Sequence, residues 1–170
     1  MKKLSVLSAL LFSAIFSFQV KAQGTIVDAA VGNADFSTLV TALKAADLVS
    51  ALQGDGPFTV FAPTNAAFGK IDEATLGSLL QAENKAALSG ILTYHVVSGK
   101  LAASDVVAAL KKGNGKVVLP TLNGQEITVL QKDGKIWIQD AKGNYSEIIA
   151  TDVMGSNGVI HVIDTVIMPK

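Results

Sequence analysis

The residues best suited to catalysis lie close together near the end of the chain, where Ser156, His161 and Asp164 share one short stretch. A serine, a histidine and a carboxylate can serve as nucleophile, general base and orienting group of a hydrolase. Ser156, however, stands in a Gly-Ser-Asn-Gly sequence and not in the Gly-x-Ser-x-Gly turn that exposes a catalytic serine. If residues 161 and 164 belong to one strand, they point to opposite faces. A hydrolase is therefore the least favoured interpretation, and we expect no catalytic residue.

The sequence also contains few residues that could bind a metal ion or a cofactor. The chain contains two histidines, His95 and His161, and no cysteine, so zinc, iron–sulfur and thiol sites lack their usual ligands. A site built from both histidines and a carboxylate would need the fold to bring them together. No His-Glu-x-x-His sequence, calcium loop or phosphate loop occurs. We expect neither a metal nor a cofactor.

The composition indicates a folded domain that does not bind nucleic acid. All 14 basic residues are lysines, so the bidentate guanidinium that reads guanine and phosphate is absent from the sequence. Aromatic residues make up 6% of the 170, too few for a face that stacks on bases. With 49% hydrophobic and 16% charged residues, the chain differs from disordered proteins.

Residues 1–22 have the pattern of a cleavable export signal. Two lysines precede an apolar stretch, after which Val20 and Ala22 supply the compact residues that a signal peptidase reads. That stretch is shorter than the ~20 residues of a membrane span. We therefore expect an exported mature chain, 23–170, that is periplasmic or secreted and has no stable membrane span. Three lysines leave with the signal, so 11 lysines face 14 carboxylates and the net charge becomes −3.

The first half of the mature chain has helical periodicity. Phe36, Leu39, Val40 and Leu43 recur at i, i+3, i+4 and i+7, which predicts a helix with Asp35 as its candidate N-cap. A stretch with strand composition then ends at a proline. We expect helices over 73–80 and 84–93, and a strand over 58–62.

The second half changes to the pattern of a β-meander. Asn-Gly, Asp-Gly and related turn sequences recur about every ten residues, and they separate runs rich in valine and isoleucine. Such turns join antiparallel strands. The strands are expected over 116–119, 126–130, 135–139, 146–151 and 159–168. Together the two halves predict a single α+β domain, with several helices flanking an antiparallel β-sheet or sandwich.

Three stretches of this sequence resemble the signature segments of the fasciclin domain, a module of extracellular and periplasmic proteins. The first is Thr-Val-Phe-Ala-Pro-Thr-Asn-Ala-Ala-Phe, the second is a central Tyr-His pair, and the third runs from Asn157 to Pro169. Their order and separation make the resemblance specific, and it covers essentially all of 23–170. It implies a fasciclin-like fold similar to the modules of β-Ig-H3. The motif residues are Thr59, Phe61, Pro63, Thr64, Asn65, Phe68, Asn157, Gly158, His161 and Asp164.

The chemistry of these motifs favours structural roles. Proline lacks an N–H group, so Pro63 is expected to end a strand, and the Thr64 hydroxyl can then cap the following helix. A buried His161 should be neutral and hydrogen-bonded, because an unpaired buried polar group costs about 1–3 kcal/mol. Asp164 is expected to accept hydrogen bonds from backbone or hydroxyl groups near the first motif.

The Tyr-His pair is the candidate for partner binding. In animal relatives this pair and its apolar flanks have been linked to integrin-mediated adhesion, so the resemblance implies a binding patch of Tyr94, His95, Ile91, Leu92 and Val96. The favoured alternative is that His95 fills a core position and Tyr94 packs with its hydroxyl outward, because apolar stripes at helical spacing usually belong to the core.

The resemblance implies an exported, non-enzymatic protein that acts in adhesion. Its partner would be a protein or polysaccharide at the cell surface or in the extracellular matrix. One domain is monovalent, so avidity would need either weak self-association or a second attachment. The alternative is a periplasmic or secreted protein that holds a small ligand or a polymer in a cleft.

Overall fold

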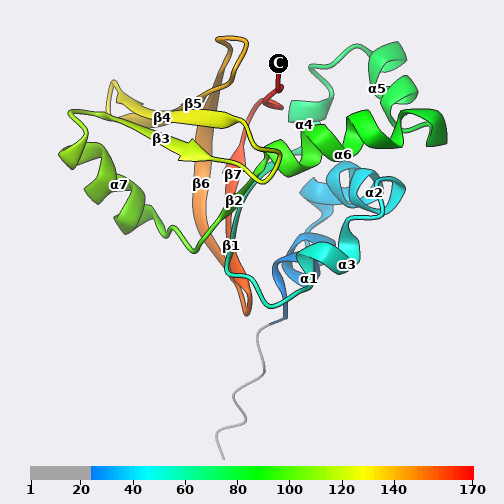
Figure 1. Cartoon of the computed structure of the whole chain (residues 1–170), viewed down its shortest axis with the longest axis horizontal. Coiled ribbons are helices and arrows are strands. Elements are labelled where there is room, and N and C mark those ends of the chain that lie inside the picture. Colours follow the sequence, from blue (N-terminus) through cyan, green and yellow to red (C-terminus); the bar gives the residue numbers. More distant parts are fainter. Residues whose placement is uncertain (1–23) are drawn as a thin grey trace, which may run out of the picture.

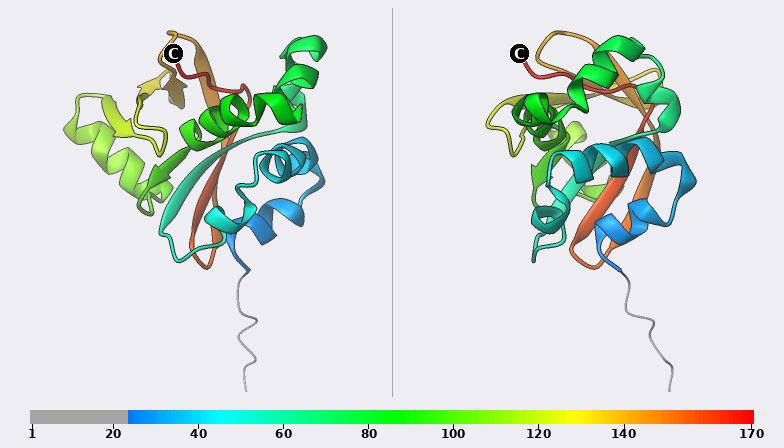
Figure 2. Two further views of the ribbon diagram at one scale, coloured as in Figure 1. Left: turned by 45° about the vertical axis from the view of Figure 1, so that its right-hand side comes forward. Right: turned by 90° about the vertical axis from the view of Figure 1, so that its right-hand side faces the viewer.

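The change of period half-way along the chain corresponds to a division between helices and strands (Figure 1). The computed structural model describes residues 24–170, so the export signal predicted over 1–22 lies outside the described residues. Helices occupy most of the first half and pack beside the long central strands, as the turned views of Figure 2 show. They are α1 (Ile26–Val31), α2 (Ser37–Ala45), α3 (Val49–Leu52), α4 (Asn65–Phe68), α5 (Glu73–Leu79) and α6 (Lys85–Tyr94), with 3-10 turns η1 (Ala34–Phe36) and η2 (Ala82–Asn84) and a later helix α7 (Ala103–Lys112).

Across residues 24–170, seven strands form one curled sheet in the order β2-β1-β7-β6-β5-β4-β3. Neighbouring strands are antiparallel except β1 and β7, which are parallel. The two ends of the sheet approach one another, since Val97 and Thr121 form an isolated bridge. The strands are β1 (Phe58–Pro63), β2 (Val96–Ser98), β3 (Lys116–Pro120), β4 (Glu126–Lys132), β5 (Lys135–Gln139), β6 (Tyr145–Gly155) and β7 (Gly158–Ile163). The α+β class and the antiparallel meander of the second half are confirmed, as one curled sheet and not a sandwich.

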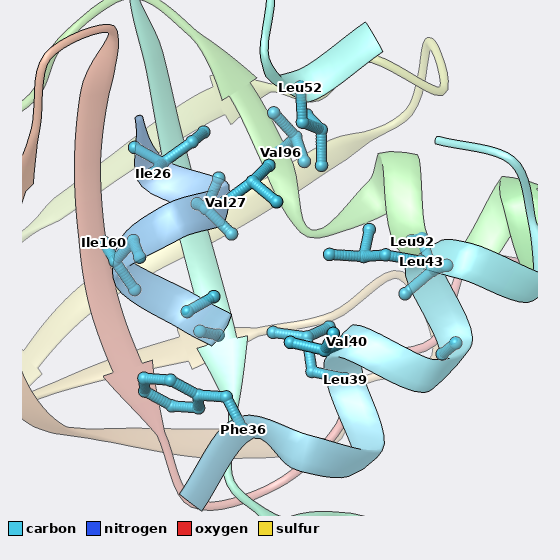
Figure 3. Close-up of a cluster of buried hydrophobic side chains, with 14 of the residues drawn as sticks. Ile26, Val27, Phe36, Leu39, Val40, Leu43, Leu52, Leu92, Val96 and Ile160 are labelled. Atoms are coloured by element: carbon cyan, nitrogen blue, oxygen red, sulfur yellow. The ribbon is translucent and has the colours of Figure 1, made fainter. Parts of the chain in front are cut away.

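Within the described chain, buried apolar side chains form two clusters, one on each side of β1 and β7. The first lies between these strands and the N-terminal helices, and Figure 3 shows Phe36, Leu39 and Ile160 meeting there. The second fills the inside of the curl, where Leu110 of α7 packs with Ile138 and other residues of the meander. Every residue of β7 is consequently buried, although the alternating pattern required only one buried face.

Three local expectations are corrected by the structure. Asp35 does not cap α2, because it lies inside the turn η1; Asn33 accepts its N–H at 3.0 Å and caps that turn instead. The last strand ends at Ile163 and not at 168, since the following residues leave the sheet and bond to side chains. Helices α1 and α7 were not expected, although Thr25 and Asp28 form a capping box that starts α1.

Candidate functional site

The first motif joins the end of β1 to the helices around it. The Thr64 hydroxyl accepts the Ala67 N–H at 3.2 Å and caps α4, as predicted, directly after Pro63 ends the strand. Asn65 accepts the Thr38 N–H at 3.0 Å and donates to the Ala34 carbonyl at 2.9 Å. This amide therefore fixes the start of α2 against α4.

The other residues of this motif are packed inside the molecule. Thr59 is fully buried, and its hydroxyl donates to the Gly99 carbonyl at 2.6 Å while accepting the Leu101 N–H at 2.9 Å. Phe61 belongs to the second hydrophobic cluster and Phe68 to the first. The motif thus holds the scaffold together and presents little to solvent.

Tyr94 is fully buried at the end of α6. Its hydroxyl donates to the Glu126 carbonyl at 3.0 Å and accepts the Ala141 N–H at 2.9 Å, so it joins α6 to the meander. Burial, assisted by the nearby Asp140 carboxylate, raises the pKa of Tyr94 above its ordinary value. The hydroxyl therefore stays protonated. It points inward, whereas the sequence suggested that it reaches out to solvent.

His95 is also buried, and both of its ring nitrogens are bonded. Nδ1 lies 2.8 Å from the Ile91 carbonyl, and Nε2 lies 3.2 Å from the Ile167 N–H. A carbonyl can only accept and a backbone N–H can only donate, so this arrangement assigns the proton to Nδ1 of a neutral ring. Burial lowers the pKa of His95 to about 4, although the bond to Ile91 acts in the opposite direction. His95 thus fills a core position, as the favoured alternative predicted.

The candidate partner-binding patch is therefore mostly inside the protein. Leu92 and Val96, like Tyr94 and His95, are at most 3% exposed and offer no surface to a partner in this fold. Ile91 is half-buried and lines a surface hollow beside the last residues of the chain. Partner binding stays a prediction for Ile91 alone, because the helical stripe on α6 faces the core.

The start of the third motif ties together segments that are far apart in sequence. The side chain of Asn157 accepts the Ile26 N–H at 2.9 Å and donates to the carbonyls of Leu52 and Gly54 at 2.8 and 2.7 Å. Gly158 passes so close to β1 that an added Cβ would lie 2.2 Å from the Phe58 carbonyl oxygen. Only glycine fits at that crossing.

His161 is buried in the middle of β7, a position that the alternating sequence pattern left open. Its Nε2 donates to the Leu101 carbonyl at 2.7 Å, and its ring lies 5.8 Å from that of Phe61. The other nitrogen, Nδ1, is buried without a hydrogen-bond partner among the described residues. The hydrogen bond of His161 Nε2 thus goes to a backbone carbonyl and not to a serine hydroxyl, as a hydrolase would require.

Asp164 follows β7 and holds the meander and α4 together. It accepts the Glu147 N–H at 2.9 Å and lies 3.1 Å from the Lys70 amine. Burial acts to raise the pKa of Asp164, but hydrogen bonds from Glu147, Lys70 and Thr165 and the Lys70 charge outweigh it, so the pKa lies below its usual value. Backbone and hydroxyl donors are present, but they come from β6 and Thr165 and not from the first motif. The partner that lies next to that motif is the Lys70 amine.

Asp140 is a structural carboxylate that the motifs did not reveal. It is 6% exposed and accepts the N–H groups of Lys142, Asn144 and Met168. The first two bonds shape the turn between β5 and β6, and the third secures the segment after β7. Its only sequence signal is an aspartate before a Lys-Gly-Asn turn, which is common in ordinary hairpins.

With the motif residues engaged inside the fold, the outer face of the meander is one surface that carries exposed side chains, among them Val118 and Tyr145. We use this term for the side of β3–β6 that points away from the second cluster. Two hollows lie on it. The first, of about 310 Å³, is lined by Leu130, Lys132, Asp133, Trp137 and Tyr145. The second, of about 640 Å³, includes Thr128 and Gln139.

Among residues 24–170, no group of three or more histidine and acidic side chains is arranged to bind a metal ion. Nor does that part of the chain include a helix of the length and apolar character needed to cross a membrane.

Known proteins share this architecture. A family model described as the fasciclin domain matches residues 34–169. The chain belongs to the fasciclin-domain family. Protein sll1483 of Synechocystis sp. is 53% identical over 145 residues, which cover 85% of this chain and 73% of that protein. The transforming growth factor-beta-induced protein ig-h3 of Sus scrofa is 34% identical over 146 residues, 86% of this chain and 19% of the larger relative.

A solved structure shares the fold of this fasciclin domain. It is a FAS1 domain pair from the insect cell adhesion molecule fasciclin I, and it superposes with a TM-score of 0.74 at 22% sequence identity. The match covers 85% of this chain and 50% of that chain, so this protein spans half the length of the pair. The likeness establishes the fold. In this fasciclin domain the signature residues build the scaffold, which leaves recognition to the surface.

Proposed function

We propose that this protein is an exported, non-enzymatic binding module that acts in adhesion at the cell surface or in the extracellular matrix. The observation that carries the proposal is the fasciclin fold itself, which this chain shares with a domain pair of an insect cell adhesion molecule. Fasciclin-domain proteins are generally adhesion proteins without catalytic activity. The predicted export signal over 1–22 is consistent with a partner outside the cytoplasm.

The way the polar residues are used supports binding over catalysis. Two residues with catalytic potential, His161 and Asp164, bond to different partners, the Leu101 carbonyl and the Glu147 N–H. Burial keeps His95 neutral in the core. Recognition would then depend on exposed side chains that give a modest apolar patch with a polar rim.

Two surfaces offer such a patch. One surrounds Ile91 and the hollow beside Met168. The other is the outer face of the meander, where Tyr145 and Ile149 are both 52% exposed. Large apolar side chains exposed together on one sheet face mark an interaction surface more often than isolated ones do. We favour the outer face.

The test is binding of labelled protein to the producer's own cells and to extracted matrix. The protein should be purified from cells that express the full chain. We expect saturable binding that Tyr145→Ala weakens by about tenfold, because truncating a central aromatic residue typically removes that much affinity or more. Val31→Ala is the matched control, since Val31 is 58% exposed on α1.

The outcomes separate the alternatives. If Ile91→Ala weakens binding and Tyr145→Ala does not, the surface beside α6 is the adhesive one. An absence of saturable binding to both cells and matrix, with all variants folded, would contradict the adhesive function. The search would then turn to ligands that co-purify with the protein.

A further inference from the structure

The outer face of the meander is assigned by the alternation of its strands. Ile127 and Val129 of β4 and Ile138 of β5 point into the second cluster, against α7. The side chains between them therefore point outward. The register places Leu130 opposite Trp137 on this side, and Gln139 opposite Tyr145.

The first hollow on this face has an aromatic lining. Tyr145 is half exposed, and Trp137 and Leu130 are half-buried beside it. The indole N–H of Trp137 is covered and has no acceptor among the described residues. A covered donor without a partner costs about 1–3 kcal/mol. Trp137 thus gives the hollow an aromatic surface, while its covered N–H is not open to solvent.

The second hollow adjoins the first and has a polar lining. The Gln139 amide donates to the Tyr145 hydroxyl at 3.0 Å, so the two hollows meet at this hydrogen bond. Gln125 and Thr128 add an amide and a hydroxyl to its wall. Together the hollows form a surface that is aromatic at one end and rich in uncharged hydrogen-bonding groups at the other.

The charges of this face favour an uncharged ligand. Lys132 and Asp133 are adjacent and of opposite sign in the first hollow. Lys135, on the same side of the sheet, pairs with Glu147 at 2.8 Å. Asp140, at the edge of the second hollow, is occupied by backbone N–H groups, and Glu126 and Lys170, whose side chains have opposite charges, line the same hollow. With no excess of either sign, the face has no field to attract a strongly charged polymer.

We propose that the outer face of the meander binds a neutral linear polysaccharide. One sugar ring packs its C–H face on the aromatic hollow, where the negative face of an aromatic ring attracts polarised C–H bonds. The next unit lies over the polar hollow, where amide and hydroxyl groups exchange hydrogen bonds with sugar hydroxyls. A cavity of about 310 Å³ lies at the lower end of the sizes that hold small molecules. This inference rests on the proposed binding function and names its ligand class.

Trp137 makes the test direct, because it is the single tryptophan of the chain. Its fluorescence therefore reports on the first hollow alone. Cellohexaose, maltohexaose and mannohexaose are the neutral probes, and hexagalacturonate is the acidic comparison. We expect at least one neutral hexasaccharide to shift the Trp137 emission saturably, and hexagalacturonate to leave it unchanged.

The variants keep the reporter in place. Tyr145→Ala and Gln139→Ala should each weaken the neutral sugar by about tenfold. Val31→Ala should bind like the unaltered protein. Unchanged melting temperatures would show that the variants are folded. A Trp137 signal that no sugar moves, or that responds equally in Tyr145→Ala, overturns the proposal. An emission that changes with the protein's own concentration would overturn it too, since a second copy would then occupy the face.

The cell-binding assay keeps this inference apart from the adhesive function. If cells bind Tyr145→Ala and the unaltered protein equally strongly, the adhesive function is retained but the outer face is not the adhesive surface. Saturable sugar binding by a protein that attaches to neither cells nor matrix would leave the polysaccharide site standing and contradict adhesion.

Discussion

At the scale of single residues, His95 shows how burial converts a titratable group into a structural one. Its pKa of about 4 lies below the ordinary value of 6.5. The unfolded chain therefore takes up a proton between these values that the folded chain does not. Stability is full above pH 6.5 and falls as the pH drops toward 4.

The corresponding experiment compares unfolding by urea at pH 7.5 and pH 5. At pH 5 the contribution of His95 should be smaller by about 2 kcal/mol, from 1.36 kcal/mol per pH unit. His95→Gln should be less stable at pH 7.5 and should lose less on acidification than the unaltered protein. Equal losses in both proteins would contradict the neutral, buried state of His95.

Thr64 carries a second prediction at this scale. Removing the hydroxyl that accepts the Ala67 N–H should lower the free energy of unfolding of Thr64→Ala by about 1 kcal/mol. Thr64→Ser is the control, because serine keeps the capping oxygen and should stay within a few tenths of a kcal/mol. If the two variants melt together, the cap contributes nothing and the loss comes from the methyl group.

At the scale of elements, Asn157 attaches α1 and the segment after α3 to the turn between β6 and β7. Asn157→Ala would leave the Ile26 N–H and the carbonyls of Leu52 and Gly54 without this partner. We expect a loss of about 3 kcal/mol in the free energy of unfolding, since unsatisfied buried groups are costly.

Amide exchange identifies the element that is released. Exchange at Ile26 should accelerate more in Asn157→Ala than exchange in the centre of β7, because α1 loses its attachment first. Gln53→Ala is the nearby control, as Gln53 is exposed. Uniform acceleration across the domain would mean that Asn157 supports the whole fold and not α1 in particular.

The elements also show what could be predicted from the sequence. Local signals sufficed for the meander, whose Asn-Gly and Asp-Gly turns dictate hairpins, and for the cap at Thr64. Contacts between distant segments had no local signal. The parallel pairing of β1 with β7, the bond from Asp140 to the Met168 N–H and the burial of both faces of β7 depend on the assembled fold. The candidate site shows the same limit. The helical spacing around the Tyr-His pair favoured a core position, but the partners of Tyr94 and His95 lie in distant segments and had no local signal.

At the scale of the whole molecule, β1 and β7 form a wall shared by both hydrophobic clusters. Damage to either cluster should therefore unfold the entire domain. Leu39→Ala in the first cluster and Ile138→Ala in the second should each cost about 2–5 kcal/mol. Helical circular dichroism, to which α1–α6 contribute more residues than α7, and Trp137 fluorescence, which follows the meander, should change at the same urea concentration. Two separated transitions would show that the clusters are independent.

The parallel pair has a further consequence for how the protein is made. Phe58 pairs with Gly158, and Pro63 with Ile163, so the central strands meet across most of the chain. Neither cluster can close until β7 has been synthesised, and such long-range pairing folds slowly. During synthesis the growing polypeptide thus lacks β7, on which both clusters pack, and it stays unfolded. An unfolded chain can pass through a narrow channel. For the exported protein that we propose, we expect the late central strand to keep the chain from folding before its synthesis is complete.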